Sequence, residues 1–143
     1  MPCATSTTRT ARTSQKRAFT YIEDGIDALM AILANRGGIA SGKIYNIGNP
    51  RNNLSVRELA RTMVDLALEY PEYRDAARKV KIVRTSAERY YGRGYQDMQN
   101  RVPNIAATKR DLGWRPRVGM KDALRYIYDA YRTHVAEARH LVK

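Results

Sequence analysis

Cysteine and histidine are scarce in this sequence, which holds a single cysteine, Cys3, and two histidines, His134 and His140. One cysteine excludes an internal disulfide framework and is typical of a reducing compartment, so we expect a cytoplasmic location. These few residues are not enough to predict a zinc site. No apolar run reaches the roughly 18 residues that a membrane-spanning helix requires, so we expect no membrane partner.

Acidic residues are also few. The 143 residues include 14 acidic and 26 basic side chains, which gives a net charge of +12 and a pI of about 10.1. This charge favours an anionic partner, such as nucleic acid, phosphate or an acidic membrane surface. Hydrophobic residues make up 43% of the chain, which is enough to build a core.

Residues 1–16 contain no acidic side chain and no hydrophobic periodicity, and five of them are threonine. Such a stretch cannot bury much apolar surface, so we expect a disordered lead over 1–16. It has no apolar central region, which excludes a secretory signal. We expect one structured domain over 17–140.

Hydrophobic periodicity and turn signals predict an alternation of strands and helices. Helices are expected at 23–35, 56–70, 104–112 and 120–138, and strands at 17–22, 43–48 and 79–83. This order predicts an α/β fold with parallel strand pairing. Three short strands are few for a parallel sheet buried on both faces, so we expect the chain to form only part of a larger sheet.

Several side chains are expected to have structural roles. Ser55 and Glu58 have the spacing of a capping box at the start of a helix. Asp24, early in the first helix, is expected to complement the helix dipole, and Trp114 and Pro116 are expected to pack and to end a helix. The first helix carries its large apolar side chains on one face: Ile22, Ile26, Leu29, Met30 and Leu33.

The segment 86–103 is the most informative, because it lacks a regular period and interleaves tyrosines and arginines around Gly92 and Gly94. A long irregular connection is usually functional or disordered. A guanidinium suits phosphate oxygens, and tyrosine offers a flat face to a base or sugar. From these residues alone a solvated loop, a nucleotide or polyphosphate site and a nucleic-acid site all remain open.

Four short segments follow one another in a recognisable order: RAFTYIED at 17–24, YNIGNP at 45–50, NRVP at 100–103 and LGWRP at 112–116. Their order and spacing resemble the C-terminal part of the extended short-chain dehydrogenase/reductases, the NAD-dependent nucleotide-sugar epimerases, dehydratases and decarboxylases. The segment YYGRGYQD at 90–97 is similar to the UDP-glucuronic acid decarboxylases of lipid A aminoarabinose synthesis, which form one half of bifunctional polymyxin-resistance proteins.

This resemblance implies a set of site residues. Arg101 matches the arginine assigned in that family as proton donor during decarboxylation, and Tyr95 matches a residue that contacts the UDP-sugar. Arg17, with Lys16 before it, matches the end of a segment that lines the nucleotide, and Arg93 is expected to bind substrate from the loop of Tyr95. Because arginine stays charged, we expect Arg101 to anchor an anion more than to act as a general acid.

The same family binds NAD through a Gly-x-x-Gly-x-x-Gly turn and uses a Tyr-x-x-x-Lys pair, and this sequence has neither. We therefore expect the C-terminal portion of a Rossmann-like enzyme that lacks the dinucleotide-binding half. NAD is the cofactor of the complete family enzyme; we expect none to bind this chain, which should be inactive alone. Expected partners are UDP-glucuronate or a related UDP-sugar, with self-association or docking to the missing half.

Other functions stay open at this point. A fragment of another nucleotide-sugar epimerase or dehydratase would share the four segments. A basic nucleic-acid-binding module would use the positive charge, although the basic residues are spread along the chain and not gathered on one helix, which disfavours it. The last alternative is a non-enzymatic module that docks on a full-length relative.

Overall fold

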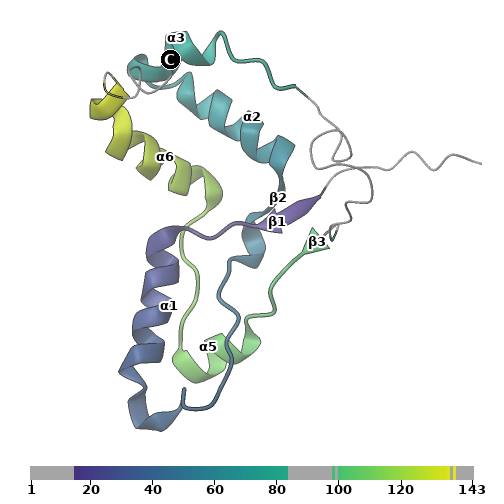
Figure 1. The fold of residues 1–143 in the computed structure, drawn as a ribbon, viewed down its shortest axis with the longest axis vertical. Helices are drawn as coiled ribbons and strands as arrows, with labels where there is room; N and C mark the ends of the chain where they lie inside the picture. Colours follow the sequence, from purple (N-terminus) through teal and green to yellow (C-terminus); the bar gives the residue numbers. More distant parts are fainter. Residues whose placement is uncertain (1–14, 84–97, 99, 136, 138–143) are drawn as a thin grey trace, which may run out of the picture.

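The computed structural model describes residues 15–83, 98, 100–135 and 137, which form an α/β fold around a small sheet (Figure 1). The strands are β1 (Lys16–Ala18), β2 (Asn53–Ser55) and β3 (Asn100–Arg101). The α-helices are α1 (Ile22–Ala34), α2 (Val56–Ala67), α3 (Pro71–Ala77), α5 (Ala106–Leu112) and α6 (Met120–Tyr131). Short 3-10 turns lie at Arg36–Gly38, Pro50–Asn52 and Arg132–His134.

The sheet has the strand order β2-β1-β3. β1 pairs antiparallel with β2 and parallel with β3, so the predicted parallel pairing is right for one pair and wrong for the other. In Figure 1 the sheet separates α1 and α5 from α2, α3 and α6. The α/β class is confirmed, and the sheet is mixed.

Two predicted strands, at 43–48 and 79–83, are not strands in the structure. Both have the right alternation, but neither has a partner strand among the described residues, and alternation alone does not make a ladder. The first segment remains extended, with Ile44 95% exposed and Ile47 packed on the core. The sheet uses β2 and β3 in their place, and these strands are too short to show a period in the sequence.

The predicted helix at 56–70 ends early, because α2 stops at Ala67 and α3 begins at Pro71. Proline has no N–H to donate and its fixed φ suits the first turn of a helix, so the chain starts a new helix there. The described residues thus hold five α-helices and not the four predicted. The capping box is confirmed: Ser55 Oγ accepts from the Glu58 amide at 3.1 Å, and the Glu58 carboxylate accepts from the Ser55 amide at 2.7 Å.

Three tyrosines join α3 and α6. The rings of Tyr70, Tyr73 and Tyr128 lie with centroids 5.0 to 6.0 Å apart. The Tyr73 hydroxyl donates to the Tyr128 carbonyl at 3.1 Å, and the Tyr128 hydroxyl donates to the Met63 carbonyl of α2 at 2.8 Å. These rings therefore pack the helices and satisfy their own hydroxyl groups.

A hydrophobic core lies between α1 and α5. It is built from Ala28, Ile105 and Trp114, with Ile47 and Leu112 packed against them. The Trp114 indole N–H donates to the Asp24 carbonyl at 2.8 Å, which satisfies its one polar atom. Trp114 and Pro116 are both buried, which confirms the structural role predicted for them.

The carboxylate of Asp24 is 2% exposed and accepts hydrogen bonds from the backbone amides of Arg117 at 3.1 Å and Val118 at 3.0 Å. Asp24 lies in the first turn of α1, as predicted, but the dipole argument missed this contact with the segment before α6. Asn49 and Asn52 donate their side-chain amides to the Val118 carbonyl at 3.0 and 3.1 Å. The segment before α6 is thereby held to both α1 and the turn at Pro50–Asn52.

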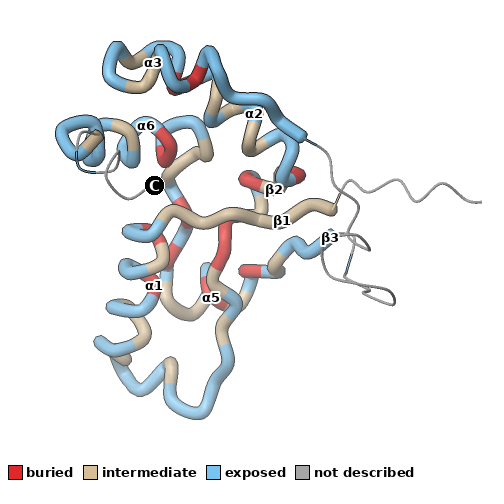
Figure 2. The backbone as a smooth tube through the Cα atoms, turned by 45° about the horizontal axis from the view of Figure 1, so that its top comes forward, coloured by how far each residue is buried: buried red, intermediate tan, exposed pale blue. Residues whose placement is uncertain are grey.

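Most of α1 is exposed, as the pale blue tube in Figure 2 shows. Only Asp24 and Ala28 of this helix are buried. The large apolar side chains predicted on one face are exposed, from 47% for Ile26 to 76% for Leu33. Contiguous apolar surface on a folded domain usually marks an interaction site.

We expect Asp24→Ala to lower the free energy of unfolding by about 3 kcal/mol, because two amides lose a buried charged acceptor. Asp27→Ala is the matched control, since the Asp27 side chain is 49% exposed and pairs with the Arg117 side chain. Loss of that surface pair should cost less than about 1 kcal/mol. Urea unfolding followed by Trp114 fluorescence measures the free energy of unfolding of both variants. Equal losses of stability would contradict the buried, stabilising role that we assign to Asp24.

Candidate functional site

Arg17 and Arg101 are register partners on the adjacent parallel strands β1 and β3. Paired residues of neighbouring strands point to the same face of a sheet, and the strands lie about 4.8 Å apart. The two guanidinium groups therefore start from neighbouring positions on one face. The structure thus brings together the predicted catalytic residue and the first of the predicted substrate-binding residues.

A cavity of about 440 Å³ lies beside Arg101. It is lined by β3 and the residues around it, together with one residue from the 45–50 segment: Asn46, Met98, Asn100, Arg101, Val102, Pro103 and Asn104. Arg17 reaches the rim, since its Nη1 donates to the Met98 carbonyl at 2.9 Å. This volume falls within the range of about 300–1,000 Å³ that is usual for small-molecule sites.

Gly48 and Pro103 bring two of the recognised segments, 45–50 and 100–103, into contact. A Cβ atom at position 48 would lie 2.5 Å from Pro103 Cγ, so only glycine allows this approach. Nearby, the Asn46 side-chain amide donates to the Asn104 carbonyl at 3.1 Å. The two segments thus lie in contact beside the cavity and form the wall at Asn46 and Pro103.

Asp111 fastens this wall to α5. Its carboxylate accepts from Arg110 at 2.7 Å, from Lys43 at 3.1 Å and from the Tyr45 hydroxyl at 3.2 Å. The hydrogen bonds from Arg110 and Lys43 are the main causes that lower the pKa of Asp111 to about 2. A carboxylate so strongly paired holds the segment at 43–48 in place although this segment has no partner strand among the described residues.

Lys16 lies on the opposite face of β1 from Arg17, because successive residues of a strand alternate. It pairs with Ser55 of β2. The pKa of Glu58 is lowered mainly by its hydrogen bonds with Ser55 and, to a smaller degree, by the charge of Lys16. The structure therefore does not bring Lys16 to the face of Arg17 and Arg101.

The other two predicted substrate-binding residues, Tyr95 and Arg93, lie outside the described residues. Their roles stay predictions, as do those of Arg17, Lys16 and Arg101.

Sequence reasoning favoured a turn role for Asn46 over a nucleotide contact, and it did not consider Asn100 and Asn104 as site residues. All three asparagines line the cavity. Each amide both donates and accepts hydrogen bonds, which suits the hydroxyl groups of a sugar and the edge of a base. Asn100 also accepts from the Asn53 side-chain amide at 3.0 Å, across the sheet from β2. The only sequence signal for Asn100 and Asn104 is that they lie close to Arg101 in the chain.

Among the described residues that line the cavity, Arg101 is the only charged one, and Arg17 joins it at the rim. Like charges on facing strand positions destabilise a sheet, so an anion bound between them would relieve the repulsion. Within the described ranges no group of three or more histidine, cysteine, aspartate or glutamate residues could hold a metal ion.

A comparison with protein families identifies the family of this chain. The model of the family described as GDP-mannose 4,6 dehydratase matches residues 4–127. The chain belongs to this family of extended short-chain dehydrogenase/reductases, which is generally NAD-dependent. The family expected from the four sequence segments is thereby confirmed.

Among solved structures, the chain is similar to the PbgP3 protein from Burkholderia pseudomallei, with 56% sequence identity and a TM-score of 0.77. The match covers 92% of this chain and 35% of PbgP3, so the chain spans about a third of that protein. The predicted division into 1–16 and 17–140 stays a prediction. In the part of the chain that the structure describes, no helix is both long and apolar enough to cross a bilayer.

We expect Arg101→Gln to stabilise the free chain by about 0.2–1 kcal/mol at low salt, because it removes the like charge facing Arg17. The gain should shrink as salt screens the pair. Arg61→Gln, at an exposed position of α2, is the control for the loss of one positive charge from the whole chain. If both variants change the urea midpoint equally at every salt concentration, the two arginines do not interact.

Proposed function

We propose that this chain is the UDP-sugar-binding part of an NAD-dependent UDP-glucuronic acid decarboxylase, of the kind used in lipid A modification and polymyxin resistance. The observation that carries the proposal is the pairing of Arg17 with Arg101 beside a cavity of about 440 Å³. Family membership and the similarity to PbgP3 support it. A cytoplasmic location, where the nucleotide-sugar would be supplied, belongs to the same proposal.

In this proposal the two arginines bind the anionic parts of UDP-glucuronate. Each guanidinium is a planar fork of donors that matches a diphosphate or a carboxylate. The asparagines of the cavity would bind the hydroxyl groups of the ribose and the sugar. The proposed reaction is an oxidative decarboxylation to a UDP-4-keto-pentose: the carboxylate leaves as CO₂, the electrons of the broken bond pass to the neighbouring 4-keto group, and the ring carbon gains a proton. Arg101 would position the carboxylate for that step.

The residues of this chain do not fit NAD. The sequence contains no Gly-x-x-Gly-x-x-Gly turn, on which the pyrophosphate of a dinucleotide would sit, and no Tyr-x-x-x-Lys pair. We therefore assign no hydride-transfer step to this chain. In the complete family enzyme NAD would be held by another stretch of polypeptide, and this chain would supply the wall that faces the sugar.

The runner-up is a part of another nucleotide-sugar epimerase or dehydratase, which the family description equally supports. The Arg17–Arg101 pair would then bind a nucleotide diphosphate with a different sugar. A nucleic-acid-binding module is the third candidate, supported by the net charge of +12. These candidates differ in nucleotide preference and in salt dependence.

We expect UDP-glucuronate to bind the 143-residue chain, and Arg17→Gln or Arg101→Gln to weaken that binding roughly tenfold to 150-fold, since each removes a charge-assisted hydrogen bond worth about 1.5–3 kcal/mol. Arg61→Gln, which lowers the charge equally outside the cavity, should bind normally. Isothermal titration calorimetry at fixed ionic strength measures all three variants.

Unchanged affinity in both arginine variants would refute the proposed site. Equal affinity for UDP-glucuronate, another UDP-sugar and GDP-mannose would favour the runner-up. Tight binding of any oligonucleotide, with a steep loss of affinity as salt rises, would favour the nucleic-acid alternative.

The exposed apolar face of α1 is the surface on which we base the proposed partner. We propose that this face, defined as Ile22, Ile26, Leu29, Met30 and Leu33, packs against the dinucleotide-binding part of the complete enzyme. PbgP3 contains a long stretch of chain beyond the matched 35%, and an amphipathic helix of this kind normally lies on a sheet or another helix. The extended segment at 43–48, with Ile44 exposed, offers a further strand to such a sheet.

We expect the chain to bind the unmatched remainder of PbgP3 when the two are mixed, and Leu29→Glu/Leu33→Glu to abolish that binding by burying charge at an apolar contact. Ala76→Glu/Ala130→Glu, which adds the same charge to exposed positions of α3 and α6, should bind normally. Size-exclusion chromatography with light scattering gives the result. Stable self-association without the remainder, or no association at all, would contradict this docking.

A further inference from the structure

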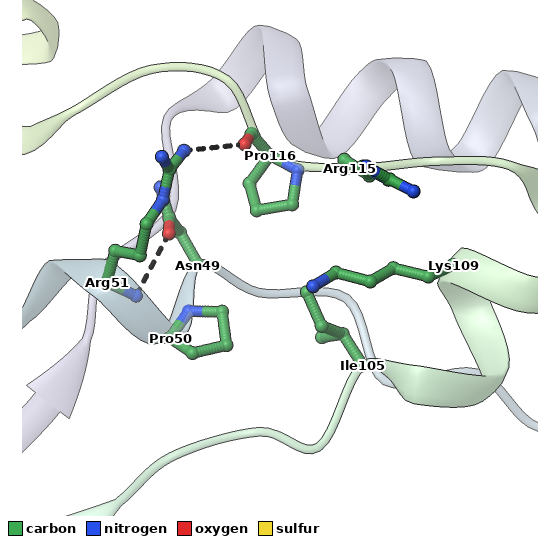
Figure 3. A pocket seen from close by; sticks show the side chains of 7 residues that line it. All are labelled: Asn49, Pro50, Arg51, Ile105, Lys109, Arg115 and Pro116. Carbon is green, nitrogen blue, oxygen red and sulfur yellow. Dashed lines mark hydrogen bonds between the residues drawn. The ribbon is translucent and has the colours of Figure 1, made fainter.

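A second cavity, of about 270 Å³, lies between α5 and the segments around positions 50 and 115 (Figure 3). It shares no lining residue with the cavity of Arg101. Its lining residues are Asn49, Pro50, Arg51, Ile105, Lys109, Arg115 and Pro116. Three of these carry a positive charge and none is acidic.

The three basic side chains come from separate parts of the chain. Arg51 belongs to the turn at Pro50–Asn52, Lys109 to α5, and Arg115 to the segment that leads into α6. Figure 3 shows Lys109 extending from α5 toward Ile105, and Arg115 on the other side of the cavity with its guanidinium directed away from Arg51. The fold therefore brings Arg51 to the same cavity as Lys109 and Arg115, which come much later in the sequence.

Arg51 is held in place. Its guanidinium donates to the Pro116 carbonyl at 2.9 Å, and its backbone amide donates to Asn49 Oδ1 at 3.1 Å. Asn49 is fully buried and also donates to the Val118 carbonyl. One bond to Pro116 uses one of the five guanidinium N–H groups and leaves others for a ligand.

The two remaining cations differ from most basic residues near them. Lys43, Arg110 and Arg117 each have a carboxylate within ion-pair distance. In contrast, the side chains of Lys109 and Arg115 have no hydrogen-bond or ion-pair partner among the described residues. Like charges that line a concave surface without a counter-charge raise the local potential and attract anions.

We propose that this cavity binds a small phosphate-bearing anion at Arg51, Lys109 and Arg115. The cations supply charge-assisted donors, and Pro50, Ile105 and Pro116 give the site an apolar floor that strengthens them. A volume of about 270 Å³ suits inorganic phosphate or one phosphate group of a larger molecule better than a whole nucleotide-sugar. The site is separate from the proposed UDP-sugar site.

Titration with inorganic phosphate at constant ionic strength, followed by amide chemical shifts of the full chain, tests this proposal. We expect shifts at residues 49–51 and 105–109. Lys109→Gln/Arg115→Gln should weaken phosphate binding at least about tenfold. Both side chains are exposed, so the variant should fold, and circular dichroism checks this.

The matched control is Arg61→Gln/Lys81→Gln, which also removes one arginine and one lysine, from exposed positions outside the cavity. It should bind phosphate normally. If phosphate binding weakens equally in the control and cavity variants, phosphate is attracted by the net charge of the chain, and the proposal is overturned. Unchanged phosphate binding in the cavity variant would also overturn it. A titration with UDP tests whether this site and the proposed UDP-sugar site are independent. If the cavity variant loses phosphate binding but still binds UDP, the result supports two independent sites.

Discussion

The carboxylate of Asp24 is the contact on which the arrangement of this chain depends. It lies buried at the start of α1, directly after the strand that carries Arg17, and it binds the amides of Arg117 and Val118. A buried carboxylate without partners would be strongly unfavourable, so the segment before α6 must lie where its amides can reach it. This one group therefore ties the beginning of the domain to its last helix.

The candidate site follows from this constraint. With α1 fixed, β1 lies between β2 and β3 and sets Arg17 opposite Arg101. Asp111 holds the neighbouring extended segment against α5, which completes the wall around the cavity. These contacts hold the two strands that carry Arg17 and Arg101 side by side at the cavity.

Much of the local structure could be predicted from the sequence, because its signals are local. The capping box at Ser55 and Glu58 and the helix that ends at Gly113 depend on residues close in the chain. The prediction of a strand at 43–48 was wrong because a strand needs a partner strand. The strand β3 was not predicted because two residues are too few to show a hydrophobic period. The cluster of Arg51, Lys109 and Arg115 was missed because only tertiary contacts bring these residues together.

The central claim is that Arg17 and Arg101 together bind the anionic groups of a UDP-sugar. A crystal structure of the chain with UDP-glucuronate tests it most directly. The account predicts diphosphate or carboxylate oxygens within about 2.7–2.9 Å of both guanidinium groups. A ligand bound elsewhere, with these two side chains still solvated, would contradict it.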